Sequence, residues 1–94
     1  METSEDFFFD GAADPGWALF NGVPQSSSDA GVAAAALENG FGRLDGASTF
    51  PHREIVGRQV ATIPDHIPVA AYDCVFLWCY STQFLLGIGP FVLP

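Results

Sequence analysis

The chain has 94 residues and a formal net charge of −8, because 11 acidic residues stand against only 3 basic ones, all of them arginine. A chain of this length forms one domain at most. Its negative charge argues against direct binding of nucleic acid, whose phosphates it would repel. Hydrophobic residues make up 49% of the sequence, and this share argues against a chain that is disordered throughout.

Residues 1–28 are predicted to be an irregular head in which acidic residues alternate with aromatic ones. Pairs of Asp or Asn with Gly or Pro recur along it and favour turns over long regular elements. Acidic segments rich in aromatic rings are typical of extended chains that dock in a hydrophobic groove. The predicted partner-binding residues of the head are Phe8, Phe9, Trp17 and Phe20. In the alternative interpretation, the same rings pack against the chain's own tail and complete a small core.

Residues 29–40 contain a predicted short helix, over about 29–38. The preceding serines can cap its first turn, Asp29 meets the positive end of the helix dipole, and an Asn-Gly pair ends it in a left-handed conformation. Ser26 is a predicted phosphorylation site, since kinases that read acidic sequences favour an acid such as Asp29 shortly after the serine. Added negative charge just before a helix is tolerated.

Residues 41–71 are predicted to be a glycine-rich loop followed by an extended segment. The sequence HREIVGRQVATI offers apolar residues for a strand, with Gly57 as its weak point. Pro64 and Pro68 push the residues before them toward extended geometry and exclude a helix through this stretch. The chain is therefore expected to enter its C-terminal part from an extended lead.

Residues 72–94 form an apolar tail in which no charged side chain follows Asp73. The tail is predicted to form an apolar helix over about 72–89, since about 20 apolar residues are enough for a helix to cross a bilayer. Gln83 would be costly near the middle of that helix unless it faced a second helix, so Gln83 is also a predicted partner-binding residue. Alternatively, the tail forms the buried strands of a small α+β domain.

Four side chains of the chain could bind a metal ion: His52, His66, Cys74 and Cys79. The two cysteines lie in an apolar run and lack the spacing of a zinc-binding pair, so we predict reduced, buried thiols and no metal site. The sequence contains no phosphate-binding loop, nucleophile elbow or HExxH motif. We therefore predict a protein that is not an enzyme and binds no cofactor.

These patterns predict a small fold with little regular structure, made of the short helix, the extended middle and the apolar C-terminal helix. The predicted function is a membrane-associated or accessory subunit. Its N-terminus is expected on the cytoplasmic side, because the acidic start lacks the features of a secretory signal and the nearest arginines precede the tail. The predicted partners are a protein and a lipid bilayer, without nucleic acid or a small-molecule substrate. The alternative is a soluble cytoplasmic interaction module whose head docks on a partner and whose tail is the core.

Overall fold

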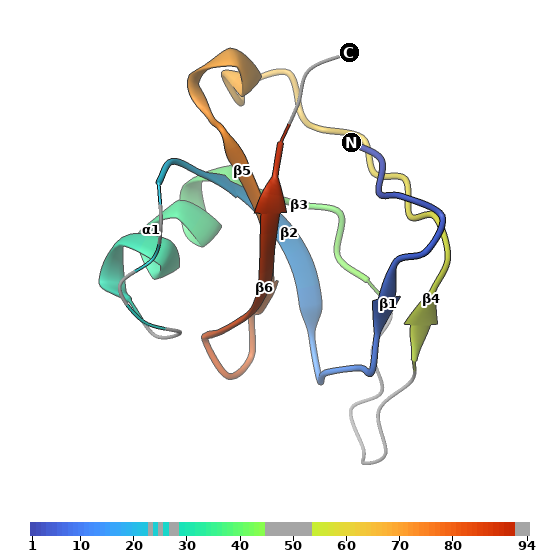
Figure 1. Ribbon diagram of the computed structural model, residues 1–94. Coiled ribbons are helices and arrows are strands. Elements are labelled where there is room, and N and C mark those ends of the chain that lie inside the picture. Colours follow the sequence, from blue (N-terminus) through green and yellow to red (C-terminus); the bar gives the residue numbers. More distant parts are fainter. Residues whose placement is uncertain (23, 25, 27–28, 45–53, 92–94) are drawn as a thin grey trace.

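The computed structural model describes residues 1–22, 24, 26, 29–44 and 54–91. Its described part contains one α-helix, one short 3-10 helix and six strands in two antiparallel sheets (Figure 1). The elements are, in chain order, β1 (Phe8–Phe9), β2 (Pro15–Phe20), α1 (Ala30–Asn39), β3 (Gly40–Phe41), β4 (Ile55–Val56), the 3-10 helix (Val69–Ala71), β5 (Cys74–Cys79) and β6 (Phe84–Pro90).

The larger sheet has the strand order β3-β2-β5-β6. β2 and β5 lie at its centre and pair along their whole length, from Pro15 opposite Cys79 to Phe20 opposite Cys74. Both strands are nearly continuous apolar runs, as expected for strands that are covered on both faces. β5 and β6 form a hairpin whose register shifts between Leu77 and Trp78.

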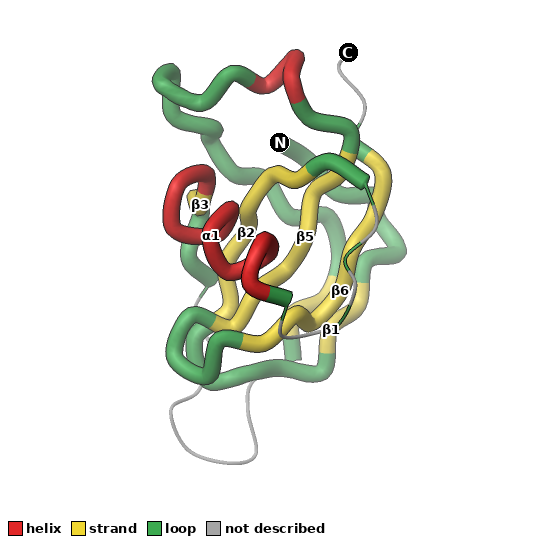
Figure 2. Tube along the Cα trace, turned by 90° about the vertical axis from the view of Figure 1, so that its left-hand side faces the viewer, coloured by secondary structure: helices red, strands yellow, loops and turns green. Residues whose placement is uncertain are grey.

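α1 covers one face of this sheet (Figure 2). Its small residues Val32 and Ala36 pack on Phe76 and Trp78 of β5. Since successive side chains of a strand point to opposite faces, Leu77 lies on the other face. The core on that other face consists of five buried residues: Trp17, Leu19, Phe41, Ile67 and Leu77.

The smaller sheet pairs β1 with β4, with Phe8 opposite Val56 and Phe9 opposite Ile55. It lies beside the larger sheet, on the side away from α1 (Figure 1). Phe9 packs against the core of that side. The head of the chain therefore supplies both a central strand of the larger sheet, β2, and part of the cover of its second face.

α1 confirms the predicted helix, displaced by one residue at each end. Its N-cap is Asp29, whose carboxylate accepts hydrogen bonds from the N–H groups of Gly31 and Val32 at 2.7 and 3.4 Å. These two hydrogen bonds satisfy backbone N–H groups that the start of a helix otherwise leaves without partners. The sequence predicted Ser27 or Ser28 as the N-cap and Asp29 in the first turn; Asp29 is the N-cap instead, and the two serines lie outside the described residues.

Gly40 does not end α1 in a left-handed conformation, as the Asn-Gly pair predicted. It is extended, with a φ of −76°, and begins β3. Its missing side chain leaves room for the hydroxyl of Tyr80, which donates to the carbonyl of Trp17 at 3.0 Å and lies 3.4 Å from that of Ala36. A Cβ at Gly40 would collide with this hydroxyl and with the Ala36 carbonyl. Tyr80 thus joins β2 and α1 to the end of β5.

The predicted C-terminal helix over residues 72–89 is wrong, and so is the prediction of little regular structure. The tail forms β5 and β6 instead, joined by a turn that contains Gln83. Gly87, Gly89 and Pro90 are poor helix residues, and β2 supplies β5 with partners for its backbone groups. The alternative prediction, a small α+β domain with the tail as strands, is confirmed. In the described part of the chain, no helix has the length and apolar character needed to cross a membrane.

Candidate functional site

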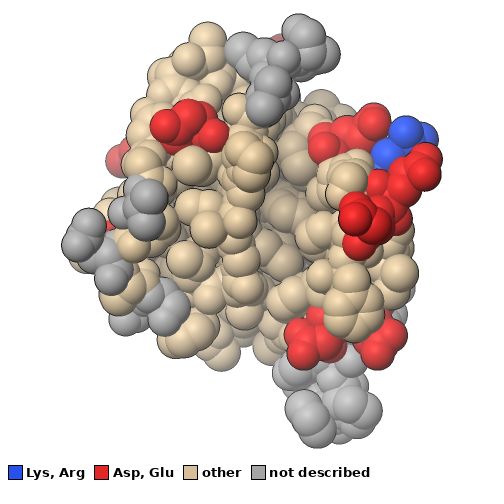
Figure 3. All heavy atoms as spheres, viewed as in Figure 1, with Lys and Arg blue, Asp and Glu red and all other residues tan. Residues whose placement is uncertain are grey.

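A cleft of about 1060 Å³ lies on the face of the larger sheet that α1 leaves free. The N-terminal residues, up to the end of β1, form one wall, and β5 with β6 forms the other. In Figure 3 it is the hollow beside β6. Most of the side chains that line the cleft are apolar, so it suits apolar groups of a ligand.

The N-terminal wall is held by backbone pairing with the segment after β4. Thr3 donates its N–H to the carbonyl of Gln59 at 2.9 Å, and the N–H of Gln59 donates to Thr3 Oγ1 at 2.8 Å. Further along, the N–H of Gly57 donates to the carbonyl of Phe7 at 2.8 Å. Hydrogen bonds of this kind hold the wall in place as a short ribbon.

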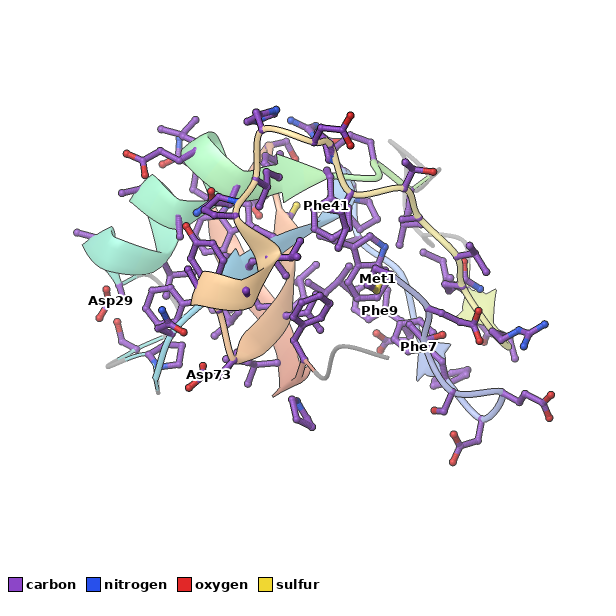
Figure 4. The ribbon with its side chains drawn as sticks, turned by 90° about the horizontal axis from the view of Figure 1, so that it is seen from above. Met1, Phe7, Phe9, Asp29, Phe41 and Asp73 are labelled. Atoms are coloured by element: carbon purple, nitrogen blue, oxygen red, sulfur yellow. The ribbon has the colours of Figure 1, made fainter. Side chains whose placement is uncertain are left out.

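Aromatic side chains of this wall turn toward the sheet. The ring of Phe7 lies 5.6 Å from that of Trp17, at a tilt of 56°, an arrangement that is favourable for aromatic pairs. Figure 4 shows Met1, Phe7 and Phe9 together in this region, and all three pack against the core beneath them. The wall is therefore continuous with the core.

The opposite side of the cleft is hollow because β6 has glycines where side chains would stand. Gly87 pairs with Leu77 and Gly89 with Val75, so both glycines share the face that lines the cleft. A Cβ built on either glycine meets no atom within 4 Å. Neither has a positive φ, so the backbone conformation does not require glycine at these positions.

Acidic residues gather on the head side of the cleft (Figure 3). The exposed acids of this part of the chain are Glu2, Glu5, Asp6 and Asp10. Within the described residues, Arg58 is the one cation that pairs with any of them, at 3.2 Å from Glu2. The pair is exposed and contributes little to stability, but the excess of acids gives this rim a negative potential that attracts cations.

β6 is the outer strand of the larger sheet, and no described strand pairs with its free edge. It carries no charged side chain. Phe84 and Ile88 are large apolar residues of β6 that are 48% and 46% exposed. Edge strands of soluble proteins are usually protected by charges or by cover from other elements, so an uncharged edge next to an apolar cleft is unusual.

Three of the predicted partner-binding residues meet at the cleft. Phe8 is 59% exposed and Phe9 is half-buried, whereas Trp17, on β2, is 4% exposed and lines the cleft between its two walls. Phe20 lies elsewhere, on the α1 face, where its ring is 6.0 Å from that of Phe76. The burial of Trp17 in the core agrees with the alternative interpretation of that ring, in which it packs against the chain's own tail.

The other two predicted site residues lie away from the cleft. Gln83 is exposed in the turn between β5 and β6 and has a positive φ of 57°. Ser26 is exposed before α1, and its phosphorylation stays a prediction. The residues that the sequence analysis missed are Gly87 and Gly89. Their spacing of two within an apolar run was the available signal, since it places both on one face of a strand.

The indole N–H of Trp17 is buried and has no hydrogen-bond partner, the one such side-chain atom found in the described chain. An unsatisfied buried donor costs about 1–3 kcal/mol. A Cβ at Gly42 would come within 3.9 Å of the indole nitrogen, so the nitrogen faces the start of the loop after β3. The lining of the cleft therefore contains one residue, Trp17, that is not optimal for the stability of the fold.

Cys79 lies at the end of β5, beside a second hollow of about 310 Å³ that Thr82 also lines. Burial raises the pKa of its thiol, but hydrogen bonds from the hydroxyls of Ser81 and Thr82, and with the backbone of Thr82 and Asp14, outweigh burial and bring the pKa to about 6. The Ser81 hydroxyl is 3.5 Å from the sulfur. The thiolate is thus favoured at neutral pH, although its side chain is only 2% exposed and reagents have little access to it.

Cys74, the other cysteine, has the opposite character. Burial and the neighbouring carboxylate of Asp73 raise the pKa of its thiol. Both cysteines are free thiols. In the described part of the chain, no three potential ligands among His, Cys, Asp and Glu lie close enough to hold a metal ion. His52, one of the four ligands considered from the sequence, lies outside the described residues.

Comparison of the chain with protein families, with curated proteins and with solved structures finds no match. No relative therefore points to a function for the cleft.

Proposed function

We propose that the chain is a protein-interaction module, with no catalytic step, whose cleft holds an extended apolar segment of a basic partner protein. The observation that carries this proposal is the open, apolar cleft between the N-terminal wall and β6. Phe8 is exposed at its rim. Large rings at such positions often contribute about 2 kcal/mol or more to binding.

The charge of the chain supports a basic partner. The acids of the N-terminal wall lie on one side of the cleft, and the whole chain carries a net charge of −8. Opposite charges on a partner speed its diffusional encounter and suppress the binding of acidic competitors. The apolar lining would hold the segment, and the acidic rim would attract residues that flank it.

The other predicted function was a subunit anchored in lipid through residues 72–89. That function depended on the C-terminal helix, and the same residues form β5 and β6 instead. Apolar side chains of β5 pack in the two cores of the fold. A docking surface for protein is therefore the better use of the apolar groups that remain exposed.

Site-specific crosslinking in the native cell tests the proposal. Phe8 is replaced by the photo-crosslinking analogue benzoylphenylalanine, and the matched control carries the same analogue at Leu37, which is 86% exposed on α1. We expect one protein adduct from position 8 that position 37 does not give. Neutralising the rim with Asp6→Asn and Asp10→Asn should then slow the association of the purified partner and flatten its dependence on salt.

The proposal is contradicted if positions 8 and 37 yield the same adducts, because the cleft would then have no preferred partner. A lipid adduct at position 8, without a protein one, would also contradict it and favour the membrane function.

A further inference from the structure

We infer that the partner segment binds as an additional strand on the free edge of β6, with alternate apolar side chains entering the cleft above Gly87 and Gly89. This inference rests on the proposed function, because it specifies how the cleft holds its ligand.

The free edge of β6 supplies the backbone groups for such pairing. β6 has 7 residues, and one side of it pairs with β5 while no described strand pairs with the other. An edge strand presents N–H and C=O groups at the spacing that another strand needs. Pro90 lacks an N–H, which limits pairing at the C-terminal end of the strand and leaves the stretch before it as the template.

The glycines supply the space for the partner's side chains. A strand that is added to β6 would lie about 4.8 Å from it, and every second side chain would point to the cleft face. On that face β6 itself has no side chains at Gly87 and Gly89 and leaves open space above them. Glycine weakens a strand and often marks the close approach of another backbone or a ligand, and here the fold itself gives no reason for it.

The charge pattern identifies the occupant as a segment with basic residues at its ends. The cleft lies between an uncharged strand and a wall with exposed acids. A second copy of the chain would bring its own net charge of −8 to the same place, and the two would repel each other. We therefore expect alternating apolar residues flanked by lysine or arginine.

The probe is a displayed library of peptides with a core of 7 residues, the length of β6, in which varied apolar residues alternate with threonine and lysines flank the core. Binding of selected peptides to the purified full chain is measured for Gly87→Val and Gly89→Val. Ala34→Val, on an exposed position of α1, is the control of similar bulk. We expect each glycine variant to weaken binding roughly tenfold or more, with an unchanged or higher melting temperature, because valine suits a strand better than glycine.

A second measurement addresses the backbone pairing. Hydrogen exchange should show that peptide binding protects those β6 amides that do not bond to β5. Peptides that are N-methylated at single residues should alternate along their sequence between weakened and unchanged binding, because only the N–H groups that face β6 form hydrogen bonds with it.

The outcomes separate the two proposals. If Gly87→Val abolishes binding but N-methylation and β6 exchange have no effect, strand addition is wrong while the cleft remains a docking site. If no library peptide binds, or if Gly87→Val leaves the affinity for the peptides unchanged, both proposals fail. Protection of β6 that grows with protein concentration without any peptide would identify a second copy as the occupant and overturn the inference.

Discussion

Replacing Trp17 with phenylalanine should leave the protein about as stable as before, although the residue is only 4% exposed. Most reductions of a buried aromatic side chain destabilise a protein. Trp17 differs because its indole N–H is buried without an acceptor. The substitution keeps a ring next to Phe7 and removes the unsatisfied donor.

Two opposing terms set the size of the effect. The substitution removes about 40 Å³ of side chain, and at about 24 cal/mol per Å³ of cavity this costs about 1 kcal/mol. Removal of the unpaired N–H regains about 1–3 kcal/mol of desolvation free energy. The free energy of unfolding should therefore stay about the same or rise by up to about 2 kcal/mol.

Trp78→Phe is the matched control. Trp78 is 2% exposed in β5, and its indole nitrogen is not among the buried atoms without a partner. The free energy of unfolding of Trp78→Phe should fall by about 1 kcal/mol or more, because a cavity of the same size forms and no unpaired N–H is removed. For a domain of this size, each 1 kcal/mol of difference between the variants appears as about 4–8 °C in melting temperature.

Urea unfolding followed by far-UV circular dichroism measures both variants, because each substitution alters tryptophan fluorescence. Equal m values would confirm that the denatured states are comparable. A Trp17→Phe variant that is as unstable as Trp78→Phe, or less stable than it, would contradict a cost of the unpaired indole N–H.

Three further predictions concern individual contacts. Gly40→Ala should lower the free energy of unfolding by about 1–3 kcal/mol, because the new Cβ collides with the Tyr80 hydroxyl. Gly87→Ala, whose Cβ enters open space, should not lower the melting temperature. Gln83→Gly should raise the free energy of unfolding, measured with urea, by about 1 kcal/mol, because Gln83 has a φ of 57°, a left-handed conformation that glycine adopts without strain. A fall in that free energy would contradict backbone strain at Gln83. The pKa of Cys79 in the folded protein, about 6, lies below its ordinary value of 9.0. The contribution of its thiolate to the free energy of unfolding is therefore fully present above pH 9 and is lost as the pH falls through about 6. The free energy of unfolding should rise by up to about 1 kcal/mol per pH unit between these values, and Cys79→Ala should remove that slope.

The helix could be predicted from the sequence because its determinants are local. Polar residues that can cap the helix and the alanines that follow them act within a few turns of chain, although the cap proved to be Asp29 and not the predicted Ser27 or Ser28. The prediction differed from the structure at Gly40, where the contact with Tyr80 decides the backbone conformation. Tyr80 lies far along the chain, so no local pattern reports that contact.

The tail could not be assigned from its composition. An apolar run without charges suits a membrane helix and a buried strand equally well. The decision comes from β2, which pairs with all of Cys74–Cys79 and belongs to the head of the chain. Gly87 and Gly89 favoured strands over a helix locally, but their role in the cleft depends on the wall opposite them, which also comes from the head.

The head illustrates why partner docking and core packing were both reasonable interpretations of its aromatic residues. Phe7, Phe8 and Phe9 follow one another where β1 forms, and their exposure alternates, half-buried, exposed and half-buried. Because a strand sends successive side chains to opposite sides, the same short run anchors the wall through Phe7 and Phe9 and offers Phe8 to solvent. Trp17 belongs with the anchoring rings. The two uses are thus divided by strand periodicity, which allows binding at the cleft and stability of the fold to be changed by separate substitutions.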